Sequence, residues 1–300
     1  MQKILFNTGY AVLYLFSLIP FWLMYIISDI VAFFLAKVFK YRADVIKENI
    51  KKAFPDLSEK DIEKIAKEFY RRFCDNFLET LKILSISEKE LTKRFETDNT
   101  LLQQLYTETD KNVTIVLGHF FNWEMGNPAL SVHNPFHQLV IYRKVASRFF
   151  EEIMIRLRGR FNTKMIATVE FSSAIRKYNT ERYSLILAAD QNPYGSGVSK
   201  AYWTNFLGHL VPFVKGPEKS AVLNDNAVVF GKIYRLKRGY YRNVLMLVTK
   251  DAKNTARGEI TKNIVHLIEQ NIKTDPANYL WSHRRFRHVY KDEYKRNLLK

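Results

Sequence analysis

A histidine that directly follows an apolar run is the residue of this chain best placed for acid–base chemistry. The run VTIVLG (113–118) is typical of a buried strand, His119 comes next, and Glu124 lies five residues further on. Ligand sites in open α/β sheets gather at the carboxyl ends of strands. An imidazole can take a proton from a hydroxyl, and a carboxylate beside it can fix its tautomer and support its charge. The pair therefore indicates general-base chemistry of the acyl-transfer type.

The spacing of the two residues sets a geometric condition on that interpretation. A five-residue step on an ideal helix turns about 140°, so the side chains would not face each other. They meet only if His119 lies in the turn after the strand and Glu124 in a following helical segment. Spacing alone is weakly specific, since His288 and Glu293 share it within the charged segment HVYKDE. The alternative for His119 is a hydrogen-bonded histidine at a turn.

The elements that must position this pair alternate between strand-like and helix-like segments. Short β-branched runs lie at 113–118, 139–142, 184–189, 227–234 and 243–249. Helix-like segments lie near 148–160, 171–178, 217–224 and 257–273. Strands that alternate with helices predict an α/β fold with a mixed sheet flanked by helices.

Two helices are expected ahead of this region. Residues 43–55 form a short amphipathic pattern that ends before Pro55, and Ser58 with Asp61 resembles a capping box. From there, apolar residues recur at three- and four-residue steps to about Leu84, which is helical periodicity. Cys74 falls inside this second helix, where we expect a packed thiol.

The first forty residues predict a hydrophobic membrane anchor. No charged residue occurs from Ile4 to Ser28, and about 20 apolar residues suffice to cross the hydrocarbon core. Pro20 would kink or split a helix, so two short helices lying in the membrane interface are an alternative, and a signal-like segment or a buried core helix are weaker ones. The positive charges follow the run, which predicts a cytoplasmic body. We therefore expect an anchor over 1–40 and a catalytic domain over 41–300.

The charge balance limits the classes of partner. Among 300 residues, 47 are Lys or Arg and 30 are Asp or Glu, which gives a net charge of +17. Such a surface favours an anionic partner, either nucleic acid, anionic lipid or an acidic protein. No helix-turn-helix, zinc-finger or RNP-type signature is present, and the apolar N-terminus also argues against nucleic acid. A single cysteine excludes an internal disulfide, and no Cys/His cluster has metal-ligand spacing.

Several ordered motifs resemble one enzyme family. GHFFNWE (118–124) resembles the H-x4-D/E signature of glycerolipid acyltransferases, and more closely the late acyltransferases of lipid A biosynthesis, the lauroyl/myristoyl family. The likeness continues through ENIKKAFPDLSEKDI (48–62), IYRK (141–144), AADQN (188–192), NFLGHLVPFVKGPEKSA (205–221) and NYLWSHRRFR (278–287). The chain departs from the family pattern at Lys144, at Asn192 and at Leu207, where the family commonly has proline, aspartate and a second phenylalanine.

This resemblance implies a reaction. A fatty acyl chain would pass from a thioester on an acidic acyl carrier protein to a hydroxyl of a lipid A precursor, at the cytoplasmic face of the inner membrane. His119 would be the general base, oriented by Glu124, with no metal and no cofactor beyond the donor. The partners expected are the carrier protein, the membrane lipid acceptor and an anionic membrane surface.

Four further residues are candidate substrate-binding residues. Arg143 follows a strand and could stabilise the oxyanion or bind a phosphate, as could backbone N–H groups near Gly118. Asn122 could donate to substrate or hold the turn, and we favour the turn. Asp190 resembles the family's aspartate–glutamine motif and either positions substrate or shapes a loop, and Gly208 permits a turn near the site.

Two rival functions stay open at this stage. The same chemistry could act on a different acceptor, such as a lyso-amino-acid lipid or a lysophospholipid. A non-catalytic, basic membrane-binding relative could also keep the fold. The acyl chain length and the oligomeric state are not readable from the sequence.

Overall fold

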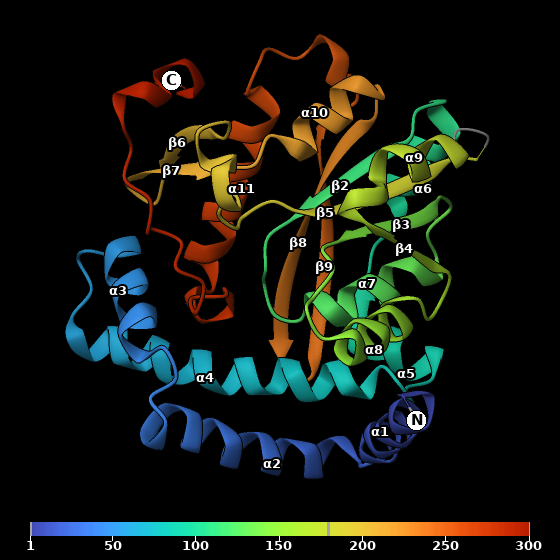
Figure 1. The fold of residues 1–300 in the computed structure, drawn as a ribbon, viewed down its shortest axis with the longest axis vertical. Coiled ribbons are helices and arrows are strands. Elements are labelled where there is room, and N and C mark those ends of the chain that lie inside the picture. The colour runs from blue at the N-terminus through green and yellow to red at the C-terminus, as the bar shows by residue number, and fades with distance from the viewer. Residues whose placement is uncertain (1, 179–180, 300) are drawn as a thin grey trace.

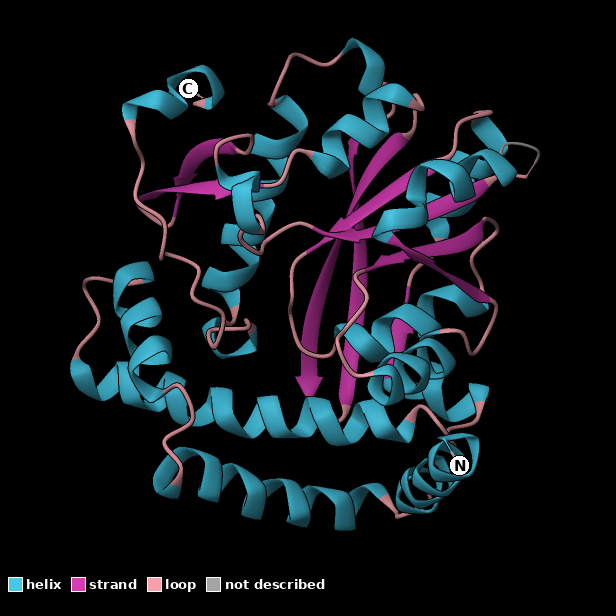
Figure 2. Cartoon of the chain, viewed as in Figure 1, coloured by secondary structure: helices cyan, strands magenta, loops and turns pink. Residues whose placement is uncertain are grey.

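A seven-stranded mixed sheet forms the centre of the structure, a computed structural model that describes residues 2–178 and 181–299 (Figure 2). The strands occur in the order β1-β9-β8-β2-β5-β3-β4, and β8 and β9 are antiparallel while the other neighbours are parallel. The bounds are β1 Phe95–Thr97, β2 Val113–Leu117, β3 His137–Tyr142, β4 Thr163–Ala167, β5 Tyr183–Ala188, β8 Ala227–Lys237 and β9 Tyr240–Thr249. A separate antiparallel hairpin pairs β6 Tyr202–Phe206 with β7 His209–Phe213.

Helices surround the sheet on both faces and along one end (Figure 1). The α-helices are α1 Gln2–Ser17, α2 Phe21–Phe33, α3 Ala43–Ala53, α4 Glu59–Lys82, α5 Glu88–Arg94, α6 Thr100–Glu108, α7 Trp123–Val132, α8 Arg148–Arg158, α9 Phe171–Lys177, α10 Gly216–Leu223 and α11 Glu259–Thr274. Short π or 3₁₀ turns are η1 Phe34–Val38, η2 Thr168–Glu170, η3 Gly195–Val198, η4 Ala252–Asn254, η5 Pro276–Asn278 and η6 Asp292–Asn297.

The parallel register brings the carboxyl ends of three strands to one edge of the sheet. Leu117 of β2 pairs with Ala188 of β5, and Val140 of β3 pairs with Ile186 of β5. The segments that follow these strands therefore leave the sheet side by side. All three carry candidate residues of the sequence analysis, so the topology assembles them where ligands bind in open α/β sheets.

The long helix α4 supports the base of the sheet. Ser58 is its N-cap and accepts a hydrogen bond from the backbone N–H of Asp61 at 3.2 Å, as the capping pattern predicts. Its apolar face buries Phe69 and Phe73 in the main core, and in Figure 1 the helix crosses the ends of β8 and β9. Cys74 is buried on this helix and burial raises its pKa to about 12, so the expected packed thiol is confirmed.

The N-terminal apolar run forms two helices rather than one. α1 ends at Ser17 and α2 begins at Phe21, with Pro20 as its N-cap, so Pro20 splits the run as its missing N–H predicts. In the described part of the chain, one helical stretch is long and apolar enough to cross a membrane, Phe21–Val38, with mean hydropathy 1.8. The division into an anchor over 1–40 and a domain over 41–300 stays a prediction.

The predicted fold class, a mixed α/β sheet flanked by helices with an apolar N-terminal helix, is confirmed. All five predicted strands and all four predicted later helices are present within a few residues of their expected bounds. The sequence patterns do not predict β1, β4, β6 or β7. β1 has only three residues, and Pro212 interrupts the pattern of β7, which tolerates proline because it belongs to a two-stranded hairpin.

Candidate active site

The turn after β2 carries His119 and lies beside the end of β5. The backbone N–H of Ala189 donates to the carbonyl of Leu117 at 3.0 Å, which extends the parallel pairing by one residue beyond the strands. Asp190 directly follows Ala189, and His119 follows Leu117 after a single glycine, Gly118. Two residues far apart in sequence are thus fixed side by side by strand register.

Asp190 forms two hydrogen bonds with His119, one to the imidazole and one to the backbone N–H. His119 Nδ1 lies 2.6 Å from Asp190 Oδ1, and the backbone N–H of His119 donates to Asp190 Oδ2 at 3.0 Å. The side chain of Asp190 is 2% exposed and that of His119 19% exposed. A carboxylate can only accept from Nδ1, so the proton of the neutral imidazole sits there and the lone pair of Nε2 is left for a substrate. Gln191 Nε2 lies 3.3 Å from His119 Nε2.

The electrostatics of this pair favour a stronger base. Burial of His119 opposes the imidazolium, but the charge of Asp190 and the hydrogen bond to it outweigh burial, and the pKa of His119 is raised. Burial also acts to raise the pKa of Asp190, yet the charge of His119 and its hydrogen bonds lower that pKa to about 2. The carboxylate therefore stabilises the imidazolium that forms when His119 takes a proton.

Glu124 lies in the first turn of α7 and lines the same pocket as His119, which meets the geometric condition set by the five-residue spacing. Its carboxylate does not hydrogen-bond to His119, which differs from the prediction that Glu124 orients the imidazole. It forms a bidentate pair with Arg158 of α8, at 2.8 Å to Nε and 2.5 Å to Nη2, and accepts from Trp123 Nε1 at 2.9 Å. The orienting position is taken by Asp190, because the register places that carboxylate on Nδ1.

Glu124 acts on His119 through charge instead. The negative charge of Glu124 raises the pKa of His119, and the positive charge of Arg158 lowers it. The side chain of Glu124 is 9% exposed and that of Arg158 is 24% exposed, so screening by water is limited. Glu124 therefore neutralises a half-buried guanidinium that would otherwise disfavour the imidazolium.

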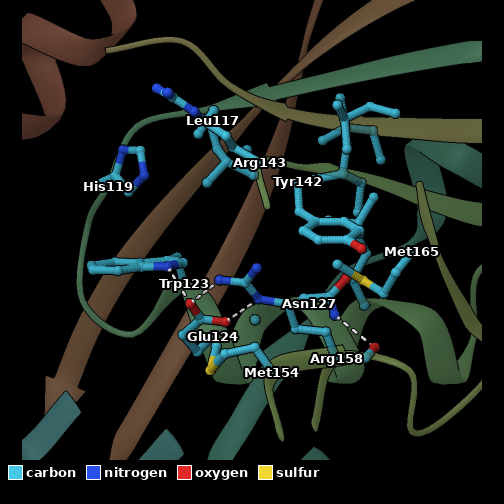
Figure 3. A pocket seen from close by; sticks show the side chains of 18 of the residues that line it. Leu117, His119, Trp123, Glu124, Asn127, Tyr142, Arg143, Met154, Arg158 and Met165 are labelled. Atoms are coloured by element: carbon cyan, nitrogen blue, oxygen red, sulfur yellow. Dashed lines mark hydrogen bonds and ion pairs between the residues drawn. The ribbon is translucent and has the colours of Figure 1, made fainter. Parts of the chain in front are cut away.

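A largely apolar pocket of about 480 Å³ opens beside His119 (Figure 3). His119, Trp123, Glu124 and Arg158 lie along one part of it, and Arg143 and Tyr142 line another part. The remaining lining side chains are mostly apolar and come from β2, β3, β4, β5, β8, α7 and α8, among them Leu117, Val140, Met154, Met165, Ile186 and Ile233. A pocket of this size and lining suits a hydrocarbon chain more than a polar ligand.

The chain matches the model of a known protein family. The family model described as bacterial lipid A biosynthesis acyltransferase matches residues 1–288. The chain belongs to this family. It is 21% identical over 281 residues to the lipid A biosynthesis palmitoleoyltransferase of Escherichia coli, a match that covers 93% of this chain and 90% of that protein. A lipid A biosynthesis acyltransferase of Haemophilus influenzae is 23% identical over 268 residues, covering 84% of this chain and 79% of that protein.

Asn122 holds the start of α7 through hydrogen bonds within the protein. It is the N-cap of α7, where its Oδ1 accepts from the backbone N–H of Met125 at 3.1 Å, while its Nδ2 donates to Glu79 Oε2 at 2.9 Å. The side chain is fully buried. Both ends of the amide are therefore bonded inside the protein, and the structure gives Asn122 the role of holding the turn instead of contacting substrate.

The backbone donors around His119 are also committed within the protein. The N–H of His119 donates to Asp190, that of Phe120 to the carbonyl of Gly118 at 2.9 Å, and that of Phe121 to the carbonyl of Asn278 at 3.0 Å. These three N–H groups are therefore bonded within the protein, and an oxyanion role for backbone N–H groups near Gly118 stays a prediction. Arg143, which lines the pocket and lies 3.6 Å from the ring centroid of Tyr194, is the sequence-predicted donor that the structure keeps available.

A C-terminal segment is hydrogen-bonded to the turn that carries His119. The N–H of Leu280 donates to the carbonyl of His119 at 3.2 Å, and Asn278 Nδ2 donates to the carbonyl of Phe121 at 2.8 Å. Asn49 of α3 in turn donates to the carbonyl of Trp281 at 2.7 Å. Three segments that the family resemblance singled out thus form one support for His119.

Two residues near Asp190 were not predicted as site residues. His283 Nε2 accepts from the backbone N–H of Asn192 at 3.1 Å, and burial lowers its pKa to about 4. Arg285 is 1% exposed and donates to Asn192 Oδ1 at 2.6 Å, and burial lowers its pKa to about 10. Their only sequence signal was membership of the NYLWSHRRFR motif.

Gly208 lies away from the pocket. It forms the turn of the β6–β7 hairpin with a φ of +82°, and a Cβ there would meet nothing within 4 Å. It does not line the pocket that contains His119. Its positive φ explains the glycine as a turn residue, so the predicted substrate contact is not what its position supports.

Proposed function

We propose that this acyltransferase moves a fatty acyl chain from an acyl carrier protein thioester to a hydroxyl of a lipid A precursor at the cytoplasmic face of the inner membrane. The observation that carries the proposal is the His119–Asp190 pair at an apolar pocket of about 480 Å³. Nε2 of His119 contacts the amide of Gln191 at 3.3 Å, a contact that a substrate hydroxyl would replace. Family membership supports the same class of reaction. The proposal requires no metal or cofactor other than the donor thioester.

The reaction follows from the position of His119. The acceptor hydroxyl hydrogen-bonds to Nε2, and its oxygen attacks the thioester carbonyl while the proton passes to the imidazole. The tetrahedral intermediate carries one negative charge, which Arg143 stabilises from the pocket wall. The C–S bond then breaks, the carbonyl re-forms as an ester, and the imidazolium returns its proton to the leaving thiolate. Asp190 stabilises the imidazolium between the two proton transfers. Glu124 balances the positive charge of Arg158.

The surface beside the pocket suits an acidic donor protein. Arg143 lines the pocket and is exposed, and Lys144 and Arg148 follow it on the exposed surface between β3 and α8. Acyl carrier protein is acidic, so Arg143 and Arg148 give complementary charge beside the pocket. Lys144 lies between them and is paired with Glu170 at 2.9 Å. The apolar part of the pocket then receives the acyl chain.

The test uses purified protein, radiolabelled acyl carrier protein thioester and a panel of lipid acceptors, with His119→Ala beside the unchanged protein. Transfer to a lipid A precursor that is lost in His119→Ala supports the proposal. Transfer only to a lyso-amino-acid lipid or a lysophospholipid keeps the mechanism and replaces the acceptor. Equal lipid products with and without His119 would point to a non-catalytic relative.

A further inference from the structure

Polar contacts fasten the apolar helix α2 to the body of the protein. Ser28 Oγ donates to Asp75 Oδ1 at 2.7 Å, and Tyr25 OH donates to Glu79 Oε1 at 2.9 Å. Asp75 and Glu79 of α4 are each 1% exposed. One face of α2 is therefore bonded to carboxyl groups inside the folded protein, where each lost partner leaves a buried polar group unsatisfied.

The charged residue of α2 is bound to the body as well. Asp29 pairs with Arg238 at 2.8 Å, and the same guanidinium pairs with Asp75 at 2.7 Å. Arg238 Nη2 also donates to the carbonyl of Tyr25 at 3.1 Å. This arginine sits in the turn between β8 and β9, so α2 is joined to the sheet as well as to α4.

Both ends of α2 are attached to α4 or its flanks. Before the helix, Lys82 Nζ donates to the carbonyls of Ser17 and Ile19 at 2.7 and 2.8 Å. After the helix, Tyr70 OH donates to the carbonyl of Tyr41 at 2.7 Å. α2 thus lies along α4, as Figure 1 shows. A bilayer crossing by α2 would carry α4 with it.

α4 cannot enter the hydrocarbon core. Twelve of its 24 residues are charged, and each charged side chain at the bilayer centre costs about 2.5–3.5 kcal/mol even on insertion scales. Releasing α2 from α4 is also unfavourable, because Asp75 would lose the hydroxyl of Ser28 and Glu79 would lose that of Tyr25. The apolar length of Phe21–Val38 is therefore not free to span.

The outward face of α2 is apolar and exposed. Trp22, Ile26, Ile30 and Phe33 follow each other at steps of four, four and three residues and are 65, 50, 53 and 59% exposed. These steps place all four on one side of the helix. Exposed apolar side chains also flank α2, with Leu15 and Leu18 before it and Val38 and Phe39 after it, and these are 53–70% exposed. Contiguous apolar exposure of this extent indicates a membrane or protein contact.

The surroundings of this face indicate lipid as the occupant. Lys37, Lys40 and Arg42 follow it within the next few residues, which suits anionic headgroups at the edge of an apolar strip. Trp22 is the type of side chain that sits at the level of the headgroups.

We propose that α1 and α2 lie in the plane of one leaflet, with Trp22, Ile26, Ile30 and Phe33 inserted, and that neither helix crosses the bilayer. This rests on the proposed membrane location and is independent of the reaction. The N-terminal helices also contact an element that lines the pocket. α1 packs on α8 through Phe6 and Phe149, whose ring centroids are 5.6 Å apart. α8 supplies Met154 and Arg158 to the pocket, so a lipid acceptor in that leaflet lies next to the site.

The test measures the depth of spin labels along α2. Trp22→Cys, Ile26→Cys, Ile30→Cys and Phe33→Cys are made singly in a Cys74→Ala background, and each labelled protein is bound to vesicles of phosphatidylethanolamine and phosphatidylglycerol. Accessibility to oxygen and to a nickel chelate gives the depth. An in-plane helix places all four labels at one depth, about 5–10 Å below the headgroups. Val169→Cys, 83% exposed in the α/β body, is the control and stays in water.

A spanning helix gives a different depth profile. Positions 22 and 33 are separated by about 16 Å along a helix axis, so a crossing helix would show a depth gradient of about that size, and this result overturns the proposal. A second measurement tests the membrane topology and does not depend on the depth of the labels. Asn7→Cys and Lys89→Cys, both at exposed positions, should react with an impermeant maleimide from the same side of the membrane, and labelling from opposite sides would contradict in-plane helices.

Failure of this proposal can be separated from failure of the proposed function. Each labelled variant is also assayed for acyl transfer, since none of the four positions lines the pocket. Transfer with a depth gradient keeps the reaction and rejects the in-plane arrangement. Uniform depth without transfer in the unchanged protein keeps the arrangement and rejects the reaction.

Discussion

The structure assigns different roles to two carboxylates, and exchanging each for its amide separates them. Asp190→Asn replaces the carboxylate 2.6 Å from Nδ1 of His119, and Glu124→Gln replaces the carboxylate paired with Arg158. Both changes preserve side-chain size. The H-x4-E spacing on its own predicts that Glu124 is the more important of the two, whereas the geometry predicts Asp190.

The expected loss for Asp190→Asn follows from the tautomer of His119. The asparagine can still accept the backbone N–H of His119 with its Oδ1, which directs its Nδ2 at Nδ1 of the imidazole. That ring nitrogen must then accept, so the proton moves to Nε2 and the base is lost. The equivalent change in a Ser-His-Asp triad lowers kcat about 10⁴-fold, which corresponds to about 5.4 kcal/mol. We expect a loss of about this order.

The expected loss for Glu124→Gln is smaller. The glutamine keeps a hydrogen bond to Arg158 but leaves its charge unbalanced, and Arg158 lowers the pKa of His119. One pKa unit is worth about 1.36 kcal/mol, or tenfold. A fall on the order of tenfold in kcat with unchanged membrane binding is therefore expected.

The assay is single-turnover transfer from the labelled thioester, measured across pH. Because His119 must be neutral to act as base and its pKa is raised above 6.5, kcat/KM should rise with pH through that raised value. Asp190→Asn removes the charge that contributes most to raising the pKa of His119. Any remaining rise of kcat/KM with pH should therefore occur at lower pH in this variant. A loss for Glu124→Gln equal to or larger than that for Asp190→Asn would refute the assignment and return the orienting role to Glu124.

Three further predictions concern stability and the remaining candidates. Glu79→Ala should lower the free energy of unfolding, measured by urea titration, by about 3 kcal/mol or more, because Tyr25, Asn122 and Tyr241 each lose a buried acceptor. The free energy of unfolding of the control variant Glu79→Gln should stay within about 1 kcal/mol of that of the unchanged protein. Arg158→Met should destabilise by about 3 kcal/mol because it leaves Glu124 buried without its cation, and adding Glu124→Gln should restore part of the loss in a double-mutant cycle. Gly208→Ala should cost about 1–2 kcal/mol at its φ of +82° and leave kcat unchanged, and a fall in kcat without a fall in Tm would show a substrate contact.

The sequence could predict His119 but not its partner. The apolar run before His119 fixes it at a strand end, which is a local signal. The bond to Asp190 depends on β2 and β5 being adjacent and in the register that pairs Leu117 with Ala188, and a single sequence holds no signal for strand order. The sequence therefore identifies Asp190 as a motif residue but does not identify His119 as its partner.

The same limit explains Glu124 and Asn122. Their placement at the start of α7 was predictable, because the helix must follow the turn. Their partners were not, since Arg158 lies 34 residues from Glu124 and Glu79 lies 43 residues from Asn122. Charge complementarity does not select one arginine among many in a chain with 47 basic residues.

The contacts between α2 and α4 bear on how a soluble version of the protein is made. Removing the first forty residues, the usual route for a membrane enzyme, would also remove the Ser28 partner of Asp75, the Tyr25 partner of Glu79 and the Asp29 partner of Arg238. Glu79 bonds to Asn122 at the start of α7, so the damage would extend to the turn that carries His119. Solubility is better sought by keeping the helix and replacing only its outward residues, Trp22, Ile26, Ile30 and Phe33, with polar ones. Such a protein would leave the lipid and keep the scaffold of its active site.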